Sequence, residues 1–373
     1  MSKHPDVVVV GGGIIGLSVA YFLANDGAAV TVLDRGDLGA EASWAGAGIL
    51  PPGNPDRAAT PIDQLRAIGS TEFAAFSAEL RERTGIDNGY RRCGGIEFLQ
   101  PDDEDVLPLW KAEGIWVEPL RGPVPGLGDI PGRAFLLPDT AQVRNPRHLR
   151  ALIAACNHRG VTLRPHTPVG GWVMDSGKVA GVRLGNSEVV VGGRYLLAAG
   201  AWSEMFLEPL GHRPHVHPVR GQIVLFKHPR ADVLLHILTL GKEYLVPRGD
   251  GHILIGSTEE PAAGFEKANT ADGVGKLREL AIRTVPALKS AEVEKCWSGL
   301  RPGSPDGLPF LGAVPGWANV FVAAGHFRAG VQLSLGTGRA MAELMTGKTP
   351  CVPLDAFRLD RTPGAGARPM FRS

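Results

Sequence analysis

A glycine-rich turn between two short apolar segments constrains this chain more than any other feature. Four valines at 7–10 lead directly into Gly11-Gly12-Gly13-Ile14-Ile15-Gly16, a helical stretch follows, and a second apolar run at 30–33 ends on Asp34. In a dinucleotide-binding βαβ unit the first glycine permits a tight turn, the second admits the pyrophosphate, and the third lets the helix pack on the sheet. Asp34 lies about 20 residues further on, where a carboxylate accepts hydrogen bonds from ribose hydroxyls. The order predicts such a unit, with a ligand-free glycine turn as the alternative.

Length and charge narrow the class of protein further. The 373 residues suffice for two domains, and 39 basic residues nearly balance 38 acidic ones. This balance argues against nucleic acid or an anionic membrane surface as the main partner. We expect neither a signal peptide nor a membrane-spanning helix, because long apolar runs are absent. The four widely spaced cysteines predict free thiols in a reducing cytoplasm.

Apolar periodicity predicts an α/β chain with an irregular second half. A small-residue segment at 42–52 suits a backbone that lies against a flat ligand, and 88–140 is turn-rich with short strands. The pattern predicts helices at 60–84, 146–159, 271–284 and 331–346, a hairpin at 169–184, and strands at 195–199, 222–226, 243–246, 252–255 and 320–324.

The first and last segments both have the strand–turn–helix pattern, which predicts a cofactor domain assembled from discontinuous pieces. We assign residues 1–85, 142–214 and 303–364 to the cofactor domain. Residues 86–141 and 215–302 then form a mostly antiparallel β domain for the substrate, and 365–373 form a C-terminal tail.

Several motifs in this order resemble one enzyme family. Besides 8–16 and 43–50, they are 166–169, 198–203, Tyr-Leu-Val-Pro-Arg at 244–248, Gly-Leu-Arg-Pro-Gly at 299–303, Asp-Gly-Leu-Pro at 306–309, Ala-Ala-Gly-His-Phe-Arg-Ala-Gly at 323–330, and 354–361. The chain is similar over nearly its whole length to the FAD-dependent D-amino-acid oxidase and sarcosine oxidase superfamily, and within it to the glycine oxidases of thiamine biosynthesis. The glycine fingerprint occurs in many flavoproteins, whereas the three motifs at 244–248, 299–303 and 323–330 are far more specific.

The resemblance implies an FAD-binding Rossmann-like domain of the glutathione-reductase type, an α/β (α+β) fold overall, and FAD bound non-covalently. It places the pyrophosphate at the first turn, the adenosine ribose at Asp34 and Arg35, and the flavin edge at 326–332. The cofactor-binding residues that it implies are Gly11, Gly13, Ile14, Ile15, Gly16, Asp34, Arg35, Ala42, Ser43, Ala47, Gly48, Ile49, Val169, His326, Phe327, Arg328, Ala329, Gly330, Val331 and Gln332.

Three residues match the substrate-binding positions of the family. Arg301 resembles its carboxylate-binding arginine, since a planar guanidinium makes two parallel hydrogen bonds to a carboxylate. Tyr244 matches a tyrosine that helps to bind that carboxylate, and Arg328 matches an arginine near flavin and substrate. Each residue has a purely structural alternative. Arg301 could be a salt-bridged arginine of a sheet, and Tyr244 a half-buried tyrosine of a strand. Arg328 could contact only the flavin or a backbone carbonyl.

Two residues depart from the pattern or need comment. The family has a histidine two residues before Tyr244, where this chain has Lys242, which could reach a solvent-facing acid or change the pocket mouth. Arg35 after Asp34 could indicate a 2′-phosphate, although stacking near adenine or exposure to solvent suits FAD better.

Two further groups of residues are weaker candidates for a functional site. His212, His215 and His217 resemble a metal cluster, but they match a structural strand of the family, so we expect no metal. Cys296 beside Trp297 suggests a covalent flavin link. Family members that tether flavin use a cysteine at a position where this chain has 309–313, which contains none.

The resemblance implies oxidative deamination of glycine, or of small amines such as sarcosine or small D-amino acids. A hydride passes to flavin and dioxygen becomes hydrogen peroxide, while the imine yields glyoxylate and ammonia or passes to a thiazole synthase. The alternatives are a dehydrogenase of the same fold that uses a quinone or electron carrier, an oxidase for sarcosine, proline or D-amino acids, a non-catalytic FAD protein, and an NAD-dependent dehydrogenase. Relatives form homotetramers, so we expect a homo-oligomer without membrane insertion.

Overall fold

The glycine-rich unit lies at the centre of a six-stranded sheet. In the computed structural model, which describes residues 4–362 and 364, the strand order is β19-β20-β13-β1-β2-β9. All neighbours are parallel except β19 and β20. The strands are β1 (Val7–Val10), β2 (Val30–Leu33), β9 (Thr162–Arg164), β13 (Arg194–Leu197), β19 (Phe310–Ala313) and β20 (Val320–Ala324).

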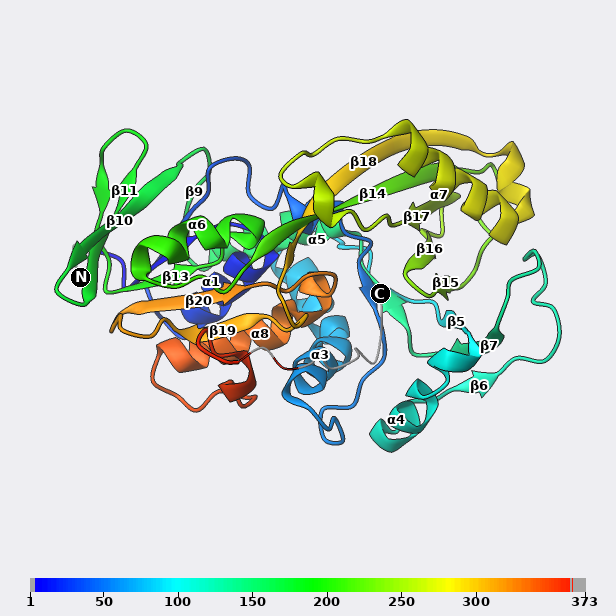
Figure 1. Cartoon of the computed structure of the whole chain (residues 1–373), viewed down its shortest axis with the longest axis horizontal. Coiled ribbons are helices and arrows are strands. Elements are labelled where there is room, and N and C mark those ends of the chain that lie inside the picture. The colour runs from blue at the N-terminus through cyan, green and yellow to red at the C-terminus, as the bar shows by residue number, and fades with distance from the viewer. Residues whose placement is uncertain (1–3, 363, 365–373) are drawn as a thin grey trace.

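Long helices cover one face of this sheet (Figure 1). They are α1 (Ile14–Asn25), α3 (Pro61–Thr84), α5 (Asn145–His158) and α8 (Gly330–Met345). Helix α8 packs against α1 and α3, and a Cβ at Gly338 would lie 2.9 Å from the Ser18 Cβ, so glycine permits this close approach. Two short helices, α2 (Ala42–Ala45) and α6 (Ser203–Leu207), lie on the loops above the strand ends.

An eight-stranded sheet forms the other half of the molecule. Its order is β18-β14-β17-β16-β15-β5-β7-β6, antiparallel except between β15 and β5. In Figure 1 the long strands β14 and β18 run from beside the first sheet across the second half of the molecule, and α7 packs against β14 and β17. The elements are β5 (Gly95–Leu99), β6 (Glu118–Pro119), β7 (Arg133–Leu137), β14 (His217–Lys227), β15 (Ile237–Leu240), β16 (Glu243–Pro247), β17 (His252–Gly256), β18 (Glu292–Gly303), α4 (Val106–Glu113) and α7 (Ala271–Thr284).

Two three-stranded sheets complete the fold. A hairpin of β10 (Val169–Asp175) and β11 (Lys178–Leu184) is joined by β12 (Val189–Val190). Its turn has positive φ at Ser176 and Gly177, as a tight hairpin turn requires. The other sheet pairs β3 (Ile49–Leu50), β8 (Ala141–Gln142) and β4 (Arg91–Arg92).

The predicted α/β class and the four predicted helices are confirmed, with ends shifted by at most a residue or so. Helix α4 was not identified, because its eight residues lie in a stretch that turn-forming residues dominate. Strand β18 was not identified either: its first half is largely exposed, and its pairing with β14 stabilises it. The domain boundaries stay a prediction, and the tail 365–373 lies outside the described residues.

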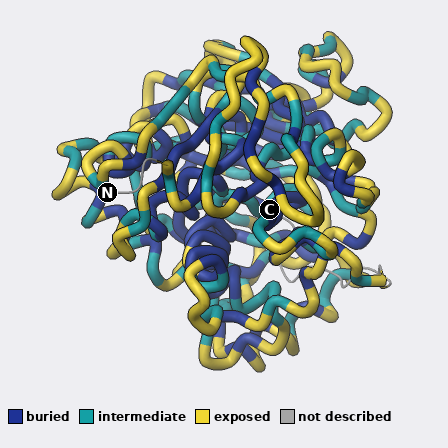
Figure 2. Tube along the Cα trace, turned by 90° about the vertical axis from the view of Figure 1, so that its left-hand side faces the viewer, coloured by how far each residue is buried: buried dark blue, intermediate teal, exposed yellow. Residues whose placement is uncertain are grey.

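Strand β1 contributes side chains to two separate hydrophobic cores, which explains why all four of its residues are valine. Val7 and Val9 point into the core beneath the helices, whereas Val8 and Val10 pack with the hairpin side. A central parallel strand has both faces covered and therefore reads as a continuous apolar run. Figure 2 shows the buried segments inside a largely exposed surface. No helix of the described residues is long and apolar enough to cross a bilayer.

A buried histidine links α5 to α3. His148 is fully buried between Phe73 and Phe76, with ring centroids 5.1 and 6.2 Å away. Its Nδ1 lies 3.1 Å from the Asn88 Nδ2. Burial lowers the pKa of His148 to about 4, so the ring is neutral in the folded protein at neutral pH.

This histidine should make stability depend on pH. Between pH 6.5 and about 4 the unfolded chain binds a proton that folded His148 does not. Its contribution is therefore complete above the unfolded pKa and is lost as pH falls, by roughly 3 kcal/mol in all. We expect His148→Phe to reduce the drop in thermal midpoint between pH 7.5 and pH 5, whereas exposed His158→Gln leaves it unchanged. If the thermal midpoint of His148→Phe falls as much as that of the wild type, His148 is not the cause of the pH dependence.

Candidate active site

A long pocket begins at the carboxyl ends of the parallel strands and reaches the inner surface of β14, β16 and β18. Of the residues predicted from sequence, the following line it: Gly11, Gly13, Ile14, Ile15, Asp34, Arg35, Ala42, Ser43, Ala47, Gly48, Ile49, Val169, Tyr244, Arg301, His326, Phe327, Arg328, Ala329, Gly330, Val331 and Gln332. Gly16 does not. The pocket thus brings together segments from both ends of the chain.

Gly16 lies behind the turn rather than in the pocket. A Cβ at Gly16 would lie 2.0 Å from the Gly11 carbonyl oxygen, so this glycine serves helix packing. Gly11 itself has φ +108°, and a Cβ there would lie 2.3 Å from the Ala198 carbonyl oxygen. Both positions therefore require glycine for backbone reasons.

The start of α1 presents its N–H groups to the pocket. The Ile14 N–H donates to the Ser43 Oγ at 2.9 Å. Asp34 accepts from the Gly12 N–H at 2.7 Å and from the Gly36 N–H at 2.9 Å, so it holds the turn as well as facing the pocket. Its oxygens retain lone pairs for a ribose hydroxyl. A helix N-terminus beside a small hydroxyl is suited to a phosphate.

Trp202 forms the outer wall of this end, a role that sequence reasoning missed. The Arg35 guanidinium lies 3.7 Å from the Trp202 ring centroid and pairs with Glu41 at 3.3 Å. Arg35 is thus stacked and paired, which leaves less of its charge for a 2′-phosphate. A signal for Trp202 was present in the sequence, where it follows the buried strand β13 after a run of small residues. Other lining residues that the prediction omitted include Thr167, Pro168, Ala199, Met205 and Phe206.

The small-residue segment is held by a partly buried arginine. Gly48 has φ +73°, and a Cβ there would lie 2.2 Å from the Val143 carbonyl oxygen. Arg248 donates to the Ala47 carbonyl at 2.8 Å and to the Gln142 Oε1 at 2.8 Å. Burial lowers the pKa of Arg248 to about 10, so it remains charged at neutral pH. The backbone of this segment therefore has a fixed path along the pocket.

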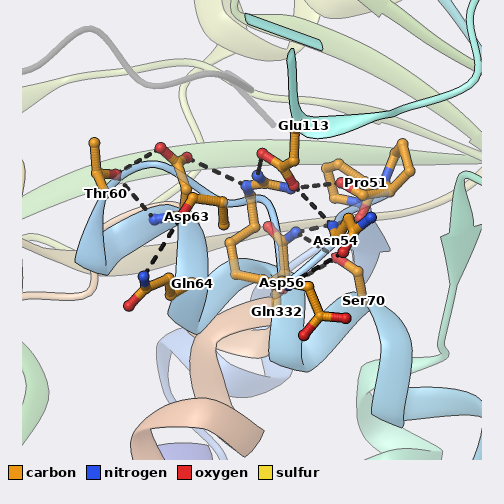
Figure 3. Close-up of polar contacts among 12 residues, drawn as sticks. Pro51, Asn54, Asp56, Thr60, Asp63, Gln64, Ser70, Glu113 and Gln332 are labelled. Atoms are coloured by element: carbon orange, nitrogen blue, oxygen red, sulfur yellow. Dashed lines mark hydrogen bonds and ion pairs between the residues drawn. The ribbon is translucent and has the colours of Figure 1, made fainter. Parts of the chain in front are cut away.

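A second cluster holds the segment that follows (Figure 3). Buried Arg66 of α3 pairs with buried Glu113 of α4, and Glu113 also accepts from the Asn54 N–H at 2.9 Å. Gln332, which lines the pocket, donates to the Pro51 carbonyl at 3.4 Å. Breaking a buried pair leaves an uncompensated charge, so these contacts fix the loop against α3 and the start of α8.

Arg301 and Tyr244 meet at the inner end of the pocket. Arg301 of β18 donates to the Thr258 carbonyl at 3.2 Å and to the Ser257 Oγ. Burial lowers the pKa of Arg301, and neighbouring Tyr244 acts in the opposite direction. A Cβ at Gly221 would lie 2.3 Å from both terminal nitrogens of the guanidinium, so Gly221 makes its space. Within the described residues Arg301 forms no ion pair, which leaves a desolvated cation facing the pocket.

Arg328 is held differently. Its Nη1 lies 3.1 Å from a Glu259 carboxylate oxygen, and its other terminal nitrogen donates to the Lys242 carbonyl. Lys242 itself pairs with Glu259 at 2.9 Å, which is the acid that sequence analysis left open as its partner. Glu259 was missed, because only the fold brings the segment after β17 to Arg328.

Helix α8 begins beside the pocket, after His326. Burial lowers the pKa of His326 to about 3, so its ring is neutral, and its Nε2 lies 3.2 Å from the Thr337 Oγ1. The positive end of α8 thus faces the pocket without a charged histidine, an arrangement that favours negative charge there.

The remaining sequence candidates lie elsewhere. His212 contacts the Pro315 carbonyl and His217 the His215 carbonyl, each at 2.9 Å. In the described part of the chain, no group of three or more metal-binding side chains is arranged to hold an ion. Cys296 is partly buried, its pKa is raised by burial, and it is not among the pocket-lining residues.

The fold and pocket define the class of dinucleotide-dependent oxidoreductases: a glycine cradle on a parallel sheet opens toward a buried cation on a second sheet. The family model for FAD dependent oxidoreductases matches residues 6–344. The chain belongs to this family, and its cofactor is FAD.

Three proteins illustrate the likeness. The glycine oxidase of Pseudomonas aeruginosa is 39% identical over 353 residues, which cover 93% of this chain and 96% of that one. The crystal structure of the glycine oxidase from Geobacillus kaustophilus superposes with a TM-score of 0.90 at 32% identity and covers 97% of this chain and 100% of that one. The bifunctional protein ThiO/ThiG of Nostoc sp. is 32% identical over 96% of this chain, which spans 55% of that protein.

Proposed function

We propose that this FAD-dependent enzyme oxidises glycine with dioxygen and also accepts small amines such as sarcosine or small D-amino acids. The observation that carries the proposal is the desolvated guanidinium of Arg301, unpaired with any described carboxylate, at the inner end of the cofactor pocket. Such a cation favours a carboxylate ligand. Similarity to glycine oxidases over almost the whole chain supports the choice of substrate.

In this proposal the protein's main contribution is orientation. Arg301 binds the substrate carboxylate through two parallel hydrogen bonds, Tyr244 donates a further one, and Arg328 lies beside them. Bound FAD would supply the redox chemistry: acceptance of a hydride from the substrate Cα, and return of the two electrons to dioxygen to give hydrogen peroxide. The imine that remains is hydrolysed to glyoxylate and ammonia.

The charge of the site would also prepare the amine. An amine must lose its proton before it can support hydride loss from Cα. The cation Arg301, which no described carboxylate pairs with, disfavours a further positive charge in the pocket and therefore lowers the pKa of a bound ammonium group. The start of α8 adds positive potential of the same sign.

The assignment of the other residues is part of the proposal. Residues 1–85, 142–214 and 303–364 would form the FAD domain, and 86–141 and 215–302 the substrate domain. The glycine turn with Ile14 and Ile15 would border the pyrophosphate, and Asp34 and Arg35 would lie at the ribose. Residues 42–43 and 47–49 would follow the ribityl chain and the ring, Val169 would meet the adenine region, and 326–332 would border the edge of the ring. The pocket supports this fit, because these segments line one continuous cavity and the Ile14 N–H at the start of α1 lies beside the Ser43 Oγ.

An anaerobic glycine titration of the purified holoenzyme tests the function. We expect glycine to bleach the visible flavin bands, and air to restore them with formation of peroxide. Bleaching only by sarcosine, proline or a D-amino acid would overturn the choice of substrate. Recovery only with a quinone would assign the chain to the dehydrogenases, and no bleaching by any amine would indicate a non-catalytic role.

Gly221→Ala should selectively weaken substrate binding. The new Cβ would displace the Arg301 guanidinium, the flexible end of a side chain, rather than the strand. We expect the apparent KM for glycine to rise about tenfold or more, with FAD content and thermal midpoint near those of the wild type. Gly275→Ala, on open helix surface, is the control. An unchanged KM would show that Arg301 does not need this space.

We further propose a homo-oligomer, a tetramer as in relatives, in the cytoplasm, with the imine passed to a thiazole synthase. Four free cysteines support a reducing compartment. The relative that carries ThiO and ThiG in one chain supports the hand-off. Light scattering of the holoenzyme tests the oligomer, and glyoxylate yield with and without added thiazole synthase tests the transfer.

A further inference from the structure

One short segment after β17 holds both inner arginines of the pocket. Ser257 and Thr258 accept hydrogen bonds from Arg301, and the next residue, Glu259, pairs with Arg328. Arg328 therefore has a carboxylate partner, whereas Arg301 has only neutral acceptors among the described residues. Two guanidinium groups face the pocket, but their charges are balanced differently.

Glu259 also forms an ion pair with a second cation. The Lys242 Nζ lies 2.9 Å from one carboxylate oxygen and the Arg328 Nη1 lies 3.1 Å from the other. The Lys242 side chain is 62% exposed and that of Arg328 11% exposed, so the three residues run from solvent to the pocket.

Glu259 is ionised in this arrangement. Burial alone would raise the pKa of the carboxyl group, but the hydrogen bond and charge of Lys242 and the charge of Arg328 outweigh it and lower the pKa. The carboxylate thus offsets one of the two cations at every pH near neutrality.

We propose that Glu259 is a specificity-determining positioning residue, which pairs with Arg328 and Lys242 so that the site accepts amines with one carboxylate and rejects those with two. This inference rests on the proposed function, because it assigns the first carboxylate to Arg301.

The reason is the number of cations that remain available. A second carboxylate on the substrate needs its own partner, and the nearest candidates, Arg328 and Lys242, already bind Glu259. An incoming dicarboxylate would have to break those pairs and approach a like charge, which disfavours it. Removing the charge of Glu259 frees Arg328, which lines the pocket, and the solvent-exposed Lys242 beside it.

Binding of two inert ligands to the holoenzyme tests this without turnover. Methoxyacetate and diglycolate have the shapes of sarcosine and iminodiacetate, and they differ by one carboxylate. We expect calorimetry to show that Glu259→Gln raises the affinity for diglycolate relative to methoxyacetate roughly 10- to 100-fold, the worth of one charged hydrogen bond. Turnover of iminodiacetate relative to sarcosine should rise in parallel.

Two further variants separate charge from general disruption of the mouth. Lys242→Met leaves the Glu259–Arg328 pair in place and removes a cation, so relative diglycolate binding should stay low or fall. Glu294→Gln, which removes a carboxylate paired with His252, should change nothing. The inference is wrong if the ratio of diglycolate to methoxyacetate affinity is unchanged in Glu259→Gln, or if it rises equally in Lys242→Met. In either case, binding of methoxyacetate would still support the proposed function. If the wild type binds neither ligand and glycine does not bleach the flavin, the proposed function is wrong as well.

Discussion

Replacing Arg301 by alanine is expected to raise the apparent KM for glycine about a hundredfold or more while FAD stays bound. The change removes the one inner arginine that no described carboxylate neutralises. Truncating one partner of a buried, hydrogen-bonded charge pair costs roughly 3 kcal/mol or more, which corresponds to that factor. Steady-state kinetics over a wide glycine range, with the flavin spectrum recorded on the same sample, measure both effects.

Two companion variants make the result specific. Arg301→Lys keeps the charge but loses the planar fork, so it should recover only part of the affinity. Arg278→Ala on the exposed side of α7 should behave as the wild type. A KM that stays within about twofold of the wild-type value in Arg301→Ala would remove Arg301 from the carboxylate role, whatever happens to kcat.

Replacing Gly11 by alanine should abolish most FAD binding. The residue has φ +108°, where an L side chain is strained, and its Cβ would lie 2.3 Å from the Ala198 carbonyl oxygen. Strain and overpacking together cost roughly 3 kcal/mol or more, and the turn must shift to relieve them. Because this turn begins the cofactor cradle, we expect flavin per chain to fall about tenfold or more and the thermal midpoint to fall with it.

Gly27→Ala is the matched control, since Gly27 has φ +89° but a Cβ added there would have no neighbour within 4 Å. It should cost about 1 kcal/mol of stability through backbone strain alone and leave FAD content unchanged. Equal loss of flavin in the two variants would show that strain, rather than the position of Gly11 in the cradle, is responsible.

Local sequence was sufficient for the elements that local interactions stabilise. Helix α3 begins after Thr60, whose Oγ1 accepts from the Asp63 N–H, and ends at Gly85 with φ 72°. Its apolar stripe has helical spacing, so its existence and bounds could be predicted. Strand β18 could not, because its stability comes from pairing with β14, a strand far earlier in the chain.

The pocket shows the same division. The glycine turn, the small-residue segment and the arginines could be found from motifs, since each motif is contiguous. Gly221, Glu259, Arg248 and Trp202 could not be assigned their contacts, because these depend on which side chains face each other after folding. The register of β14 and β18 places Gly221 opposite Gly299, two residues before Arg301, and so opens the space for the guanidinium.

By itself, the sequence determined the βαβ cofactor unit, the helices and the family, because backbone-limited glycines and short-range periodicity are written in consecutive residues. Only the tertiary structure decided which charges at the inner end are paired. Arg301 faces a glycine and neutral acceptors, whereas Arg328 faces Glu259 and Lys242. The free energy of a buried charge depends on the groups around it, and long-range strand register and loop packing set those groups.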